Sequence, residues 1–229
     1  MRLVLTCEHA FPDIPEQYQK LFFKEPEILN THEAYDPGAF DLFQELENLA
    51  DFSHFQTIGR LLIETNRSKH HPKLFSRYSR LLSDQDKADI LQIYYTSYRT
   101  IIESKIREYM KEGEAVIHLS VHTFTPVLNG VERNCDIGIL YDPKRLTEKN
   151  FCYDFKAAIQ RKNSKLKLRF NYPYLGKADG FTTALRKIFP ENYSGIEIEV
   201  KQKWVSRNKM DSNIKTLLLE SLKELINKH

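Results

Sequence analysis

The sequence is poor in several residue types that mark particular classes of protein. Among its 229 residues are only 3 cysteines, 8 glycines, 9 prolines and 1 tryptophan. An odd number of cysteines without paired spacing argues against a disulfide framework, and it predicts a reduced, cytoplasmic protein. The low glycine and proline contents exclude collagen-like chains and chains rich in linkers.

The sequence also lacks a large charge of either sign and a long apolar run. Lys and Arg together number 34 and Asp and Glu 31, so the formal net charge is +3 at pH 7. Nucleic-acid-binding proteins usually carry a clear basic excess, so we expect no nucleic acid as a partner. No stretch of about 18 apolar residues occurs, and we therefore expect neither a transmembrane helix nor a membrane partner.

Short apolar runs alternate along the chain with longer patterns of helical period. A chain of 229 residues can bury one sizeable core. Because no linker or repeat interrupts the alternation, we predict one α/β domain over residues 1–229, with a largely parallel sheet covered by helices. The predicted strands are 3–5, 61–63, 115–122, 136–141, 166–170 and 195–200, and the predicted helices are 40–49, 83–113, 146–161, 182–188 and 211–227.

Polar side chains stand at the ends of several predicted strands. In open α/β sheets, ligands bind beyond the carboxyl ends of the strands. Two histidines and a carboxylate from separate strand ends can complete a three-ligand zinc site, with a further glutamate nearby as general base. The residues in such positions are Glu8, His9, Asn66, Arg67 and His122, with Glu199 on the last strand.

These residues also have structural interpretations. Asp36 precedes Pro37 at a predicted helix start, where it can cap the helix. Arg67 could be an ordinary surface arginine, although the adjacent Asn66 favours a fork that binds a carboxylate. Glu197 shares a strand face with Glu199 but could face solvent from an edge strand. His118 lies deeper on the face of His122, and we interpret it as a core residue or a support for the site.

Seven groups of short segments resemble the N-formylglutamate amidohydrolase family, and they span nearly the whole chain. Each segment is weak alone, but their order and spacing together make the resemblance specific. They are residues 6–10, 35–39, 63–67, 121–126, 130–133 with 136–138, 171–174 with 179–180, and 195–200.

The resemblance implies a fold and an activity. The fold is that of zinc exopeptidases, related to carboxypeptidase A and aspartoacylase. It is a three-layer α/β/α sandwich with a mostly parallel, mixed central sheet. The activity is metal-dependent hydrolysis of a small, carboxylate-bearing amide, an N-acyl and specifically N-formyl amino acid such as N-formylglutamate.

The resemblance also implies roles for individual residues. His9 and His122 would hold one divalent metal ion, for which we expect Zn²⁺. Glu199 would be the catalytic base, and Asn66 with Arg67 would bind a carboxylate of the substrate. Two further substrate anchors are expected, Arg60 and Arg133, because an acidic acyl-amino acid carries two carboxylates.

The third metal ligand is where the sequence departs from related exopeptidases. These often have a glutamate three residues after the first histidine, and Pro12 occupies that position here. Asp36 is the preferred candidate, with Glu8 and Asp13 as alternatives. The helix-capping role of Asp36 is the main competing interpretation.

Other functions remain open at this stage. Glu8 stands where family members often have a proline before the histidine, which places the chain among relatives with less certain substrates. A related metallo-carboxypeptidase or a deacylase for another small amide is the first alternative. A non-catalytic binding protein of the same fold is the second, although the presence of Glu199 argues against it.

Overall fold

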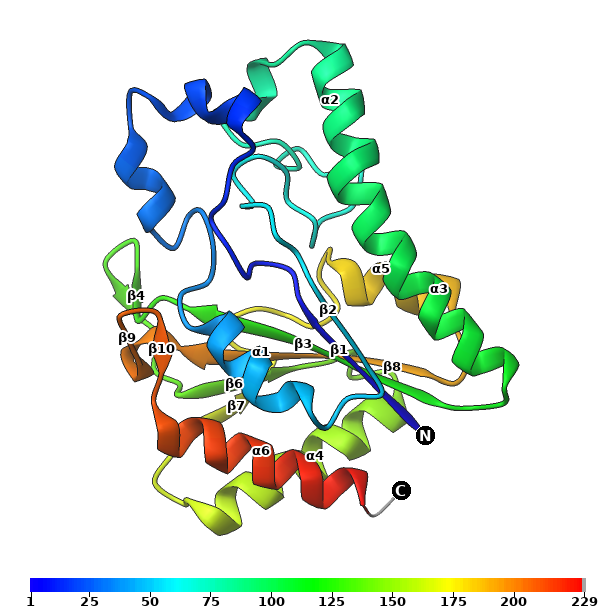
Figure 1. Ribbon diagram of the computed structural model, residues 1–229. Helices are drawn as coiled ribbons and strands as arrows, with labels where there is room; N and C mark the ends of the chain where they lie inside the picture. Colours follow the sequence, from blue (N-terminus) through cyan, green and yellow to red (C-terminus); the bar gives the residue numbers. More distant parts are fainter. Residues whose placement is uncertain (228–229) are drawn as a thin grey trace.

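Six strands form one mixed sheet in the computed structural model, which describes residues 1–227 (Figure 1). The strand order is β2-β1-β3-β8-β6-β7, in which β2, β1, β3 and β8 are mutually parallel. β6 is antiparallel to β8 and parallel to β7. The predicted mixed, mostly parallel sheet is confirmed. The strands are β1 (Arg2–Cys7), β2 (Phe52–Phe55), β3 (Val116–Phe124), β6 (Ile137–Leu140), β7 (Leu168–Phe170) and β8 (Tyr193–Lys201).

Helices cover both faces of this sheet (Figure 1). On one face lie α1 (Ala39–Glu47), α4 (Leu146–Lys162) and α6 (Ser212–Ile226), whose buried side chains share the largest hydrophobic cluster with the sheet. On the other face lie α3 (Ser97–Lys111) and α5 (Phe181–Ile188), which pack around a second cluster. The three-layer α/β/α arrangement is therefore confirmed.

Two central strands carry apolar side chains on one face and polar side chains on the other. Ile117, Leu119 and Val121 of β3 belong to the largest hydrophobic cluster. Successive side chains of a strand point to opposite faces, so His118 and His122 lie on the face toward α3 and α5. β8 follows the same rule, with Glu197 and Glu199 on that second face as predicted.

The predicted strand at 61–63 is wrong. These residues are buried but lie in a loop, and the strand at this edge of the sheet is β2. Their side chains pack in a third hydrophobic cluster with Tyr18, Phe22 and Tyr95, away from the sheet. A short apolar run looks the same in sequence whether a sheet or such a cluster buries it.

The long helix predicted at 83–113 is present as three continuous segments. They are α2 (Asp84–Ile90), the π-helical η4 (Leu91–Thr96) and α3. Ser83 caps the start by accepting a hydrogen bond from the Asp86 backbone N–H, and Gly113 follows the end with a φ of +80°. The smaller elements are η1 (Glu16–Phe22), η2 (Pro26–Asn30), η3 (Ser79–Leu81), β4 (Val127–Leu128), β5 (Val131–Glu132), η5 (Gln202–Trp204), β9 (Val205–Ser206) and β10 (Lys209–Met210).

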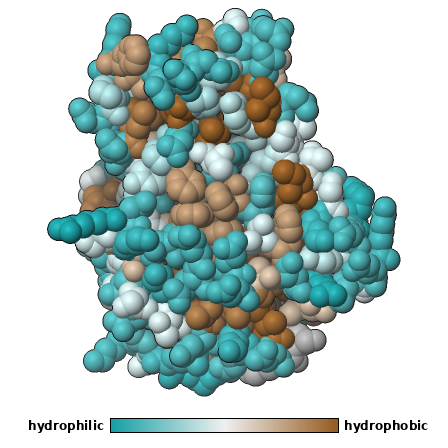
Figure 2. All heavy atoms as spheres, in the orientation of Figure 1, coloured by the Kyte–Doolittle hydropathy of each residue, from teal (hydrophilic) through white to brown (hydrophobic). Residues whose placement is uncertain are grey.

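The face of the molecule shown in Figure 2 is mostly polar, and the three cysteines are buried. Apolar side chains lie on this face in separate patches (Figure 2). In residues 1–227, no helix combines the length and the apolar character that a membrane span requires. Cys7, Cys135 and Cys152 are all buried free thiols.

A buried ion pair fixes α5 against β8 and α4. The Arg186 Nε donates to Glu148 Oε1 at 2.8 Å, and both side chains are almost fully buried. The other two guanidinium nitrogens donate to the backbone carbonyls of Gly176 and Gly195, each at 2.6 Å. Glu148 also accepts from the Asp142 backbone N–H at 2.8 Å. The network therefore joins four segments of the chain.

Replacing Arg186 with methionine removes the buried cation of the pair and leaves Glu148 with only the less buried Arg145, whose Nε lies 3.2 Å from Glu148 Oε1. Removing one member of a buried ion pair typically costs about 3–5 kcal/mol, and we expect a loss of this size in the free energy of unfolding measured with urea. Arg161→Met is the matched control, because its ion pair with Glu224 is largely exposed and should contribute less than about 1 kcal/mol. Equal small losses in both variants would contradict a structural role for Arg186.

Asp41 links α1 to the C-terminal part of the chain. Its carboxylate accepts from the Met210 backbone N–H at 3.0 Å and lies 2.9 Å from Lys209 Nζ and 3.1 Å from Lys215 Nζ. Burial opposes ionisation of the carboxyl group, but the hydrogen bonds from the two lysines outweigh it and lower the pKa of Asp41. The folded protein therefore favours the charged form.

Asp41→Asn should lower the free energy of unfolding at pH 7 by about 1–2 kcal/mol, because it removes hydrogen bonds to a charged group. Since the folded pKa lies below the unfolded value, the carboxylate stabilises the fold above about pH 4 and loses this effect as the pH falls through the folded pKa. Urea unfolding at pH 7 and pH 3 measures the difference. The exposed Asp154→Asn is the control, and a deficit that persists undiminished at pH 3 would contradict the electrostatic cause.

Candidate active site

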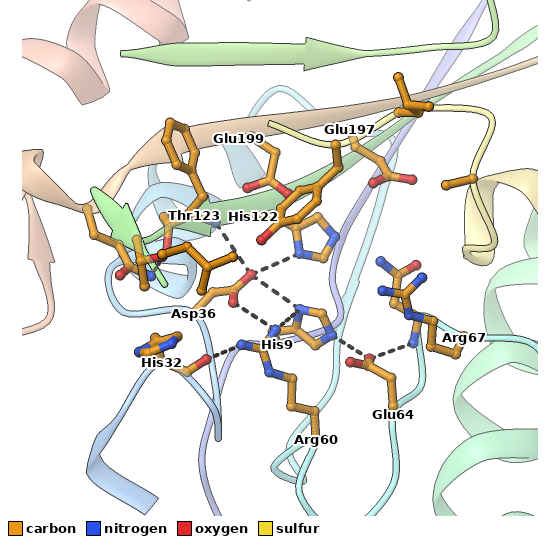
Figure 3. Close-up of a pocket in the computed structure, with 18 of the residues that line it drawn as sticks. His9, His32, Asp36, Arg60, Glu64, Arg67, His122, Thr123, Glu197 and Glu199 are labelled. Atoms are coloured by element: carbon orange, nitrogen blue, oxygen red, sulfur yellow. Dashed lines mark hydrogen bonds and ion pairs between the residues drawn. The ribbon is translucent and has the colours of Figure 1, made fainter. Parts of the chain in front are cut away.

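Three buried side chains converge at the carboxyl ends of β1 and β3 (Figure 3). His9 follows β1, His122 lies near the end of β3, and Asp36 lies in the turn before α1. One oxygen of Asp36, Oδ2, is 3.2 Å from His9 Nδ1 and 3.0 Å from His122 Nδ1. A ligand atom from each side chain lies within 4.8 Å of the other two. We call these residues the His9/Asp36/His122 cluster.

The helix-capping interpretation of Asp36 is wrong. α1 begins after Gly38, which has a φ of +78°, and no side chain caps the helix. The Asp36 carboxylate instead turns into the cluster, where Oδ1 also lies 3.1 Å from Arg60 Nη1. Burial disfavours the charged form, but Arg60 and His9 hold the pKa of Asp36 well below its usual range. Asp36 is therefore an ionised group aimed at both histidines.

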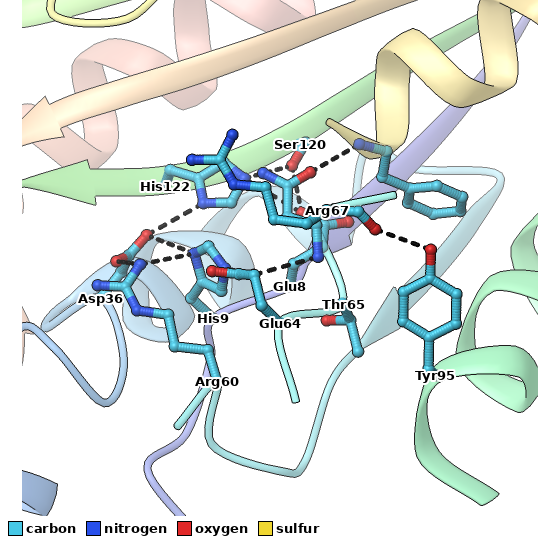
Figure 4. A network of polar contacts seen from close by, with 12 residues as sticks. Glu8, His9, Asp36, Arg60, Glu64, Thr65, Arg67, Tyr95, Ser120 and His122 are labelled. Atoms are coloured by element: carbon cyan, nitrogen blue, oxygen red, sulfur yellow. Dashed lines mark hydrogen bonds and ion pairs between the residues drawn. The ribbon is translucent and has the colours of Figure 1, made fainter. Parts of the chain in front are cut away.

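Further carboxylates lie against the far nitrogens of the two histidines (Figure 4). His9 Nε2 is 2.5 Å from Glu64 Oε1, and His122 Nε2 is 3.2 Å from Glu8 Oε2. Ser120 Oγ also lies 2.8 Å from His122 Nε2. A carboxylate on the far nitrogen fixes the imidazole tautomer and orients a metal-binding histidine. The two Nδ1 atoms are thus left facing Asp36.

The cluster fits a divalent metal ion by the chemistry of its donors. Two imidazole nitrogens and one carboxylate oxygen are a common set for zinc at catalytic sites, and the supporting carboxylates Glu64 and Glu8 complete the usual surroundings. The same donors accept several other divalent ions. The cluster can therefore hold a metal ion, and its donors alone do not fix which one.

The two alternative ligands lie elsewhere. Glu8 is fully buried behind His122, and its carboxylate accepts hydrogen bonds from Tyr98 at 2.9 Å and from Ser120. Asp13 is exposed, and its backbone carbonyl accepts from the Gly59 N–H. Only Asp36 of the three candidates joins the two histidines.

Glu64 is a site residue that the sequence did not reveal. It lies between Ile63 and Asn66, in one of the segments that carried the family resemblance, but its partner His9 is 55 residues away. Nothing in the local sequence separates a glutamate that supports a histidine from one in an ordinary loop.

Glu199 lies beside the cluster on β8, where its backbone pairs with that of His122. The side chain is only 5% exposed, and its Oε2 atom has no hydrogen-bond partner in the described structure. Burial raises the pKa of Glu199 to about 8, against the opposing effect of His122 and with the negative charge of Asp36 adding to the rise. A carboxyl group with such a pKa can both accept and release a proton near neutral pH.

The cluster and Glu199 open into one cavity of about 430 Å³ (Figure 3). Its walls combine charged and apolar side chains, as is usual in sites for small molecules. Besides these four residues the lining includes His32, Arg60, Glu64, Asn66, Arg67, Thr123, Phe124, Thr125, Leu128, Tyr174, Leu175, Ala178, Asp179, Glu197 and Gln202.

Asn66 and Arg67 lie together on one wall of the cavity. Asn66 Oδ1 accepts from the Phe181 backbone N–H at 2.8 Å, so the residue also fixes the start of α5. Arg67 donates to the backbone carbonyl of Asp179 at 2.9 Å through Nη1. The remaining guanidinium nitrogens of Arg67 have no partner within residues 1–227.

The other two predicted arginine anchors are more fully engaged. Arg60 uses one nitrogen for Asp36 and donates with the others to the backbone carbonyls of Glu33 and His32. Arg133 donates to Tyr174 Oη at 3.1 Å and stacks near its ring, 5.1 Å from the centroid. Arg133 does not belong to the cavity lining.

Glu197 and His118 lie on the same face of the sheet as the cluster, in different surroundings. Glu197 is not on an edge strand, because β8 lies between β3 and β6, and its side chain lines the cavity. His118 is fully buried between Thr6 Oγ1 at 2.8 Å and Tyr193 Oη at 2.7 Å, and burial lowers its pKa to about 4. His118 is therefore a core residue, as predicted.

Known proteins resemble this chain in sequence and in fold. The family model for N-formylglutamate amidohydrolase matches residues 1–205. The crystal structure of gene product Atu2144 from Agrobacterium tumefaciens has a TM-score of 0.85 and 23% identity, covering 99% of this chain and 91% of that one. N-formylglutamate amidohydrolase from Ralstonia eutropha JMP134 has a TM-score of 0.70 and 14% identity, covering 100% and 95%. These identities show a shared fold. No curated protein sequence matches the chain.

Proposed function

The chain belongs to the N-formylglutamate amidohydrolase family, and we propose that it is a metal-dependent enzyme that hydrolyses the amide bond of an N-formyl amino acid. One observation carries the proposal. The buried His9/Asp36/His122 cluster and the unpartnered carboxyl oxygen of Glu199 face the same cavity. This combination supplies a place for a metal ion and a proton acceptor beside it.

His9, Asp36 and His122 would hold the ion, and we expect Zn²⁺. A divalent ion bound there would lower the pKa of a water molecule and polarise the carbonyl group of the substrate. Glu64 and Glu8 hold the two imidazoles in the orientation that leaves both Nδ1 atoms toward Asp36. Arg60 holds Asp36 from its other oxygen.

Glu199 would move the proton. Its free Oε2 takes a proton from the attacking water while the water oxygen forms a bond with the formyl carbon. Glu199 then gives this proton to the amide nitrogen as the C–N bond breaks. The first products are formic acid and the free amino acid; formic acid then ionises to formate and the amino group takes up that proton, so atoms and charges balance. Burial favours this role because it stabilises the protonated, uncharged form that the carboxyl group takes between the two transfers.

Arg67 would anchor the α-carboxylate of the amino acid. It keeps guanidinium donors free within the cavity, and Asn66 beside it adds an amide group. A planar guanidinium binds a carboxylate with two parallel hydrogen bonds. Arg60 and Arg133 remain candidates for further contacts, but their main contacts are to Asp36 and Tyr174.

The same groups could hydrolyse another small amide, such as an N-acetyl amino acid or a short peptide. The cavity of about 430 Å³ is compatible with several acyl groups. Turnover of matched N-formyl and N-acetyl amino acids separates the formyl hydrolase from a general deacylase. A binding protein without activity would turn over neither.

Loss of the metal is the first test. The double variant His9→Ala/His122→Ala should lose the bound ion, from about one zinc per chain to below about 0.1, because the remaining carboxylate alone is a weak ligand set. Metal analysis of zinc-loaded, dialysed protein measures this. His70→Ala/His71→Ala is the control, since His70 is exposed, His71 is half-buried and neither lines the cavity. Equal zinc contents in the two variants would contradict the site.

Loss of the base is the second test. Glu199→Gln should lower kcat by at least about 100-fold, because general base catalysis typically contributes 10²–10⁴. The zinc content should stay at the wild-type level, since Glu199 is not a ligand. The exposed Glu191→Gln is the control for loss of one carboxylate. Wild-type turnover by Glu199→Gln would exclude Glu199 as the base.

A further inference from the structure

Glu197 is a carboxylate in the cavity that has no ion-pair partner in residues 1–227. Arg186 is close enough to interact with its charge, but directs its own hydrogen bonds to Glu148 and to two backbone carbonyls. Glu197 lines the cavity from β8, two residues before Glu199. Its Oε1 atom accepts one hydrogen bond, from Thr182 Oγ1 at 2.7 Å. No Lys, Arg or His side chain of residues 1–227 forms an ion pair with it. A partly buried carboxylate without a counter-ion favours a ligand that supplies one.

Arg67 is the complementary group at the same end of the cavity. Figure 3 shows Glu197 and Arg67 on one side, with Asp36 on the other. Segment 179–180 lies next to both groups. A Cβ atom placed on Gly180 would lie 3.5 Å from Glu197 Oε1, and the Asp179 carbonyl accepts a hydrogen bond from Arg67. Arg67 and Glu197 make no ion pair with each other, and each is left open to a ligand.

The cavity offers little to a second negative charge. Every guanidinium nitrogen of Arg60 already has an acceptor, and Arg133 does not line the cavity. A substrate with two carboxylates would place one on Arg67 and the other in the same space as Glu197 and Asp179. Like charges at close range oppose binding, which is a common means of excluding a wrong substrate.

We propose, on the basis of the function proposed above, that Glu197 selects N-formyl amino acids with a cationic side chain. Arg67 binds the α-carboxylate, and Glu197 binds the ammonium or guanidinium group at the end of the side chain. Leu175 and Ala178 line the same cavity and offer apolar surface to the methylene groups of the substrate side chain. Glu197 is thus a specificity-determining residue, and Glu199 on the same strand remains the catalytic one.

The test compares kcat/KM for three substrates of zinc-loaded protein: Nα-formyl-L-lysine, Nα-formyl-L-norleucine and N-formyl-L-glutamate. The norleucine derivative has the same chain length as lysine without the charge. We expect the wild-type protein to prefer lysine over norleucine by about tenfold or more, as a charge-assisted hydrogen bond allows, and to prefer it over glutamate by a larger factor. In Glu197→Gln the lysine-to-norleucine ratio should fall to about one.

The exposed Glu191→Gln is the matched control and should keep the wild-type ratio. Glu197→Gln can still accept the hydrogen bond of Thr182, and circular dichroism checks that it folds. A wild-type preference for N-formylglutamate would overturn the inference and leave the proposed function intact. So would a loss in Glu197→Gln that is equal for all three substrates.

A binding measurement separates this inference from the proposed function. Calorimetry on zinc-loaded Glu199→Gln should give tighter binding of Nα-formyl-L-lysine than of Nα-formyl-L-norleucine, and the difference should disappear in Glu199→Gln/Glu197→Gln. If the wild-type protein hydrolyses none of the substrates, the proposed function fails and the binding ratio alone decides the inference. Equal binding of the two compounds would overturn it.

Discussion

The site depends on one constraint, which is that polar groups buried on the second face of the sheet must find partners. β3 and β8 alternate strictly, so their apolar side chains fill one core while histidines, a serine and glutamates occupy the other face. An unpaired buried polar group costs free energy. Three of these groups meet this requirement through side-chain hydrogen bonds. His118 bonds to Thr6, Glu8 accepts from Tyr98, and Ser120 bonds to His122. Glu199 Oε2 has no such partner, and its place in the cavity leaves it available to a ligand or for proton transfer.

The electrostatics of the cluster follow from the same constraint. Two buried carboxylates, Glu8 and Asp36, and the half-buried Glu64 surround two histidines, and burial by itself raises the pKa of each of them. The histidines and Arg60 reverse this effect, and the pKa of Glu64 falls to about 2. For Glu199 the effect of burial exceeds the opposing effect of the same two histidines, and its pKa rises. Two kinds of carboxylate therefore lie within one cavity, one kind ionised to support the histidines and one poised to exchange a proton.

Sequence patterns predicted the parts of the fold that repeat locally. The alternation of 195–200 placed Glu197 and Glu199 on one face, in agreement with the structure. The strand predicted at 115–122 is β3, which continues to Phe124, so His122 lies two residues before its end. The apolar run at 61–63 gave the wrong element, because its burial comes from a separate cluster. Asp36 had two local interpretations, and only its contacts with His9 and His122, which lie 27 and 86 residues away, separate them. Glu64 could not be predicted, because its role exists only through His9.

The strand register also links catalysis to specificity. β8 pairs with β3 so that Glu197 lies opposite Ser120 and Glu199 lies opposite His122. Two residues of a strand span roughly 6.5 Å, which is comparable to the length of an extended lysine side chain. The cluster and Glu199 could act on any small amide, so the choice of substrate must come from the rest of the cavity. A rigid central strand that carries both the proton acceptor and the second carboxylate fixes their separation. In a substrate held at Arg67, the end of the side chain would therefore contact Glu197 while the amide bond lies at Glu199.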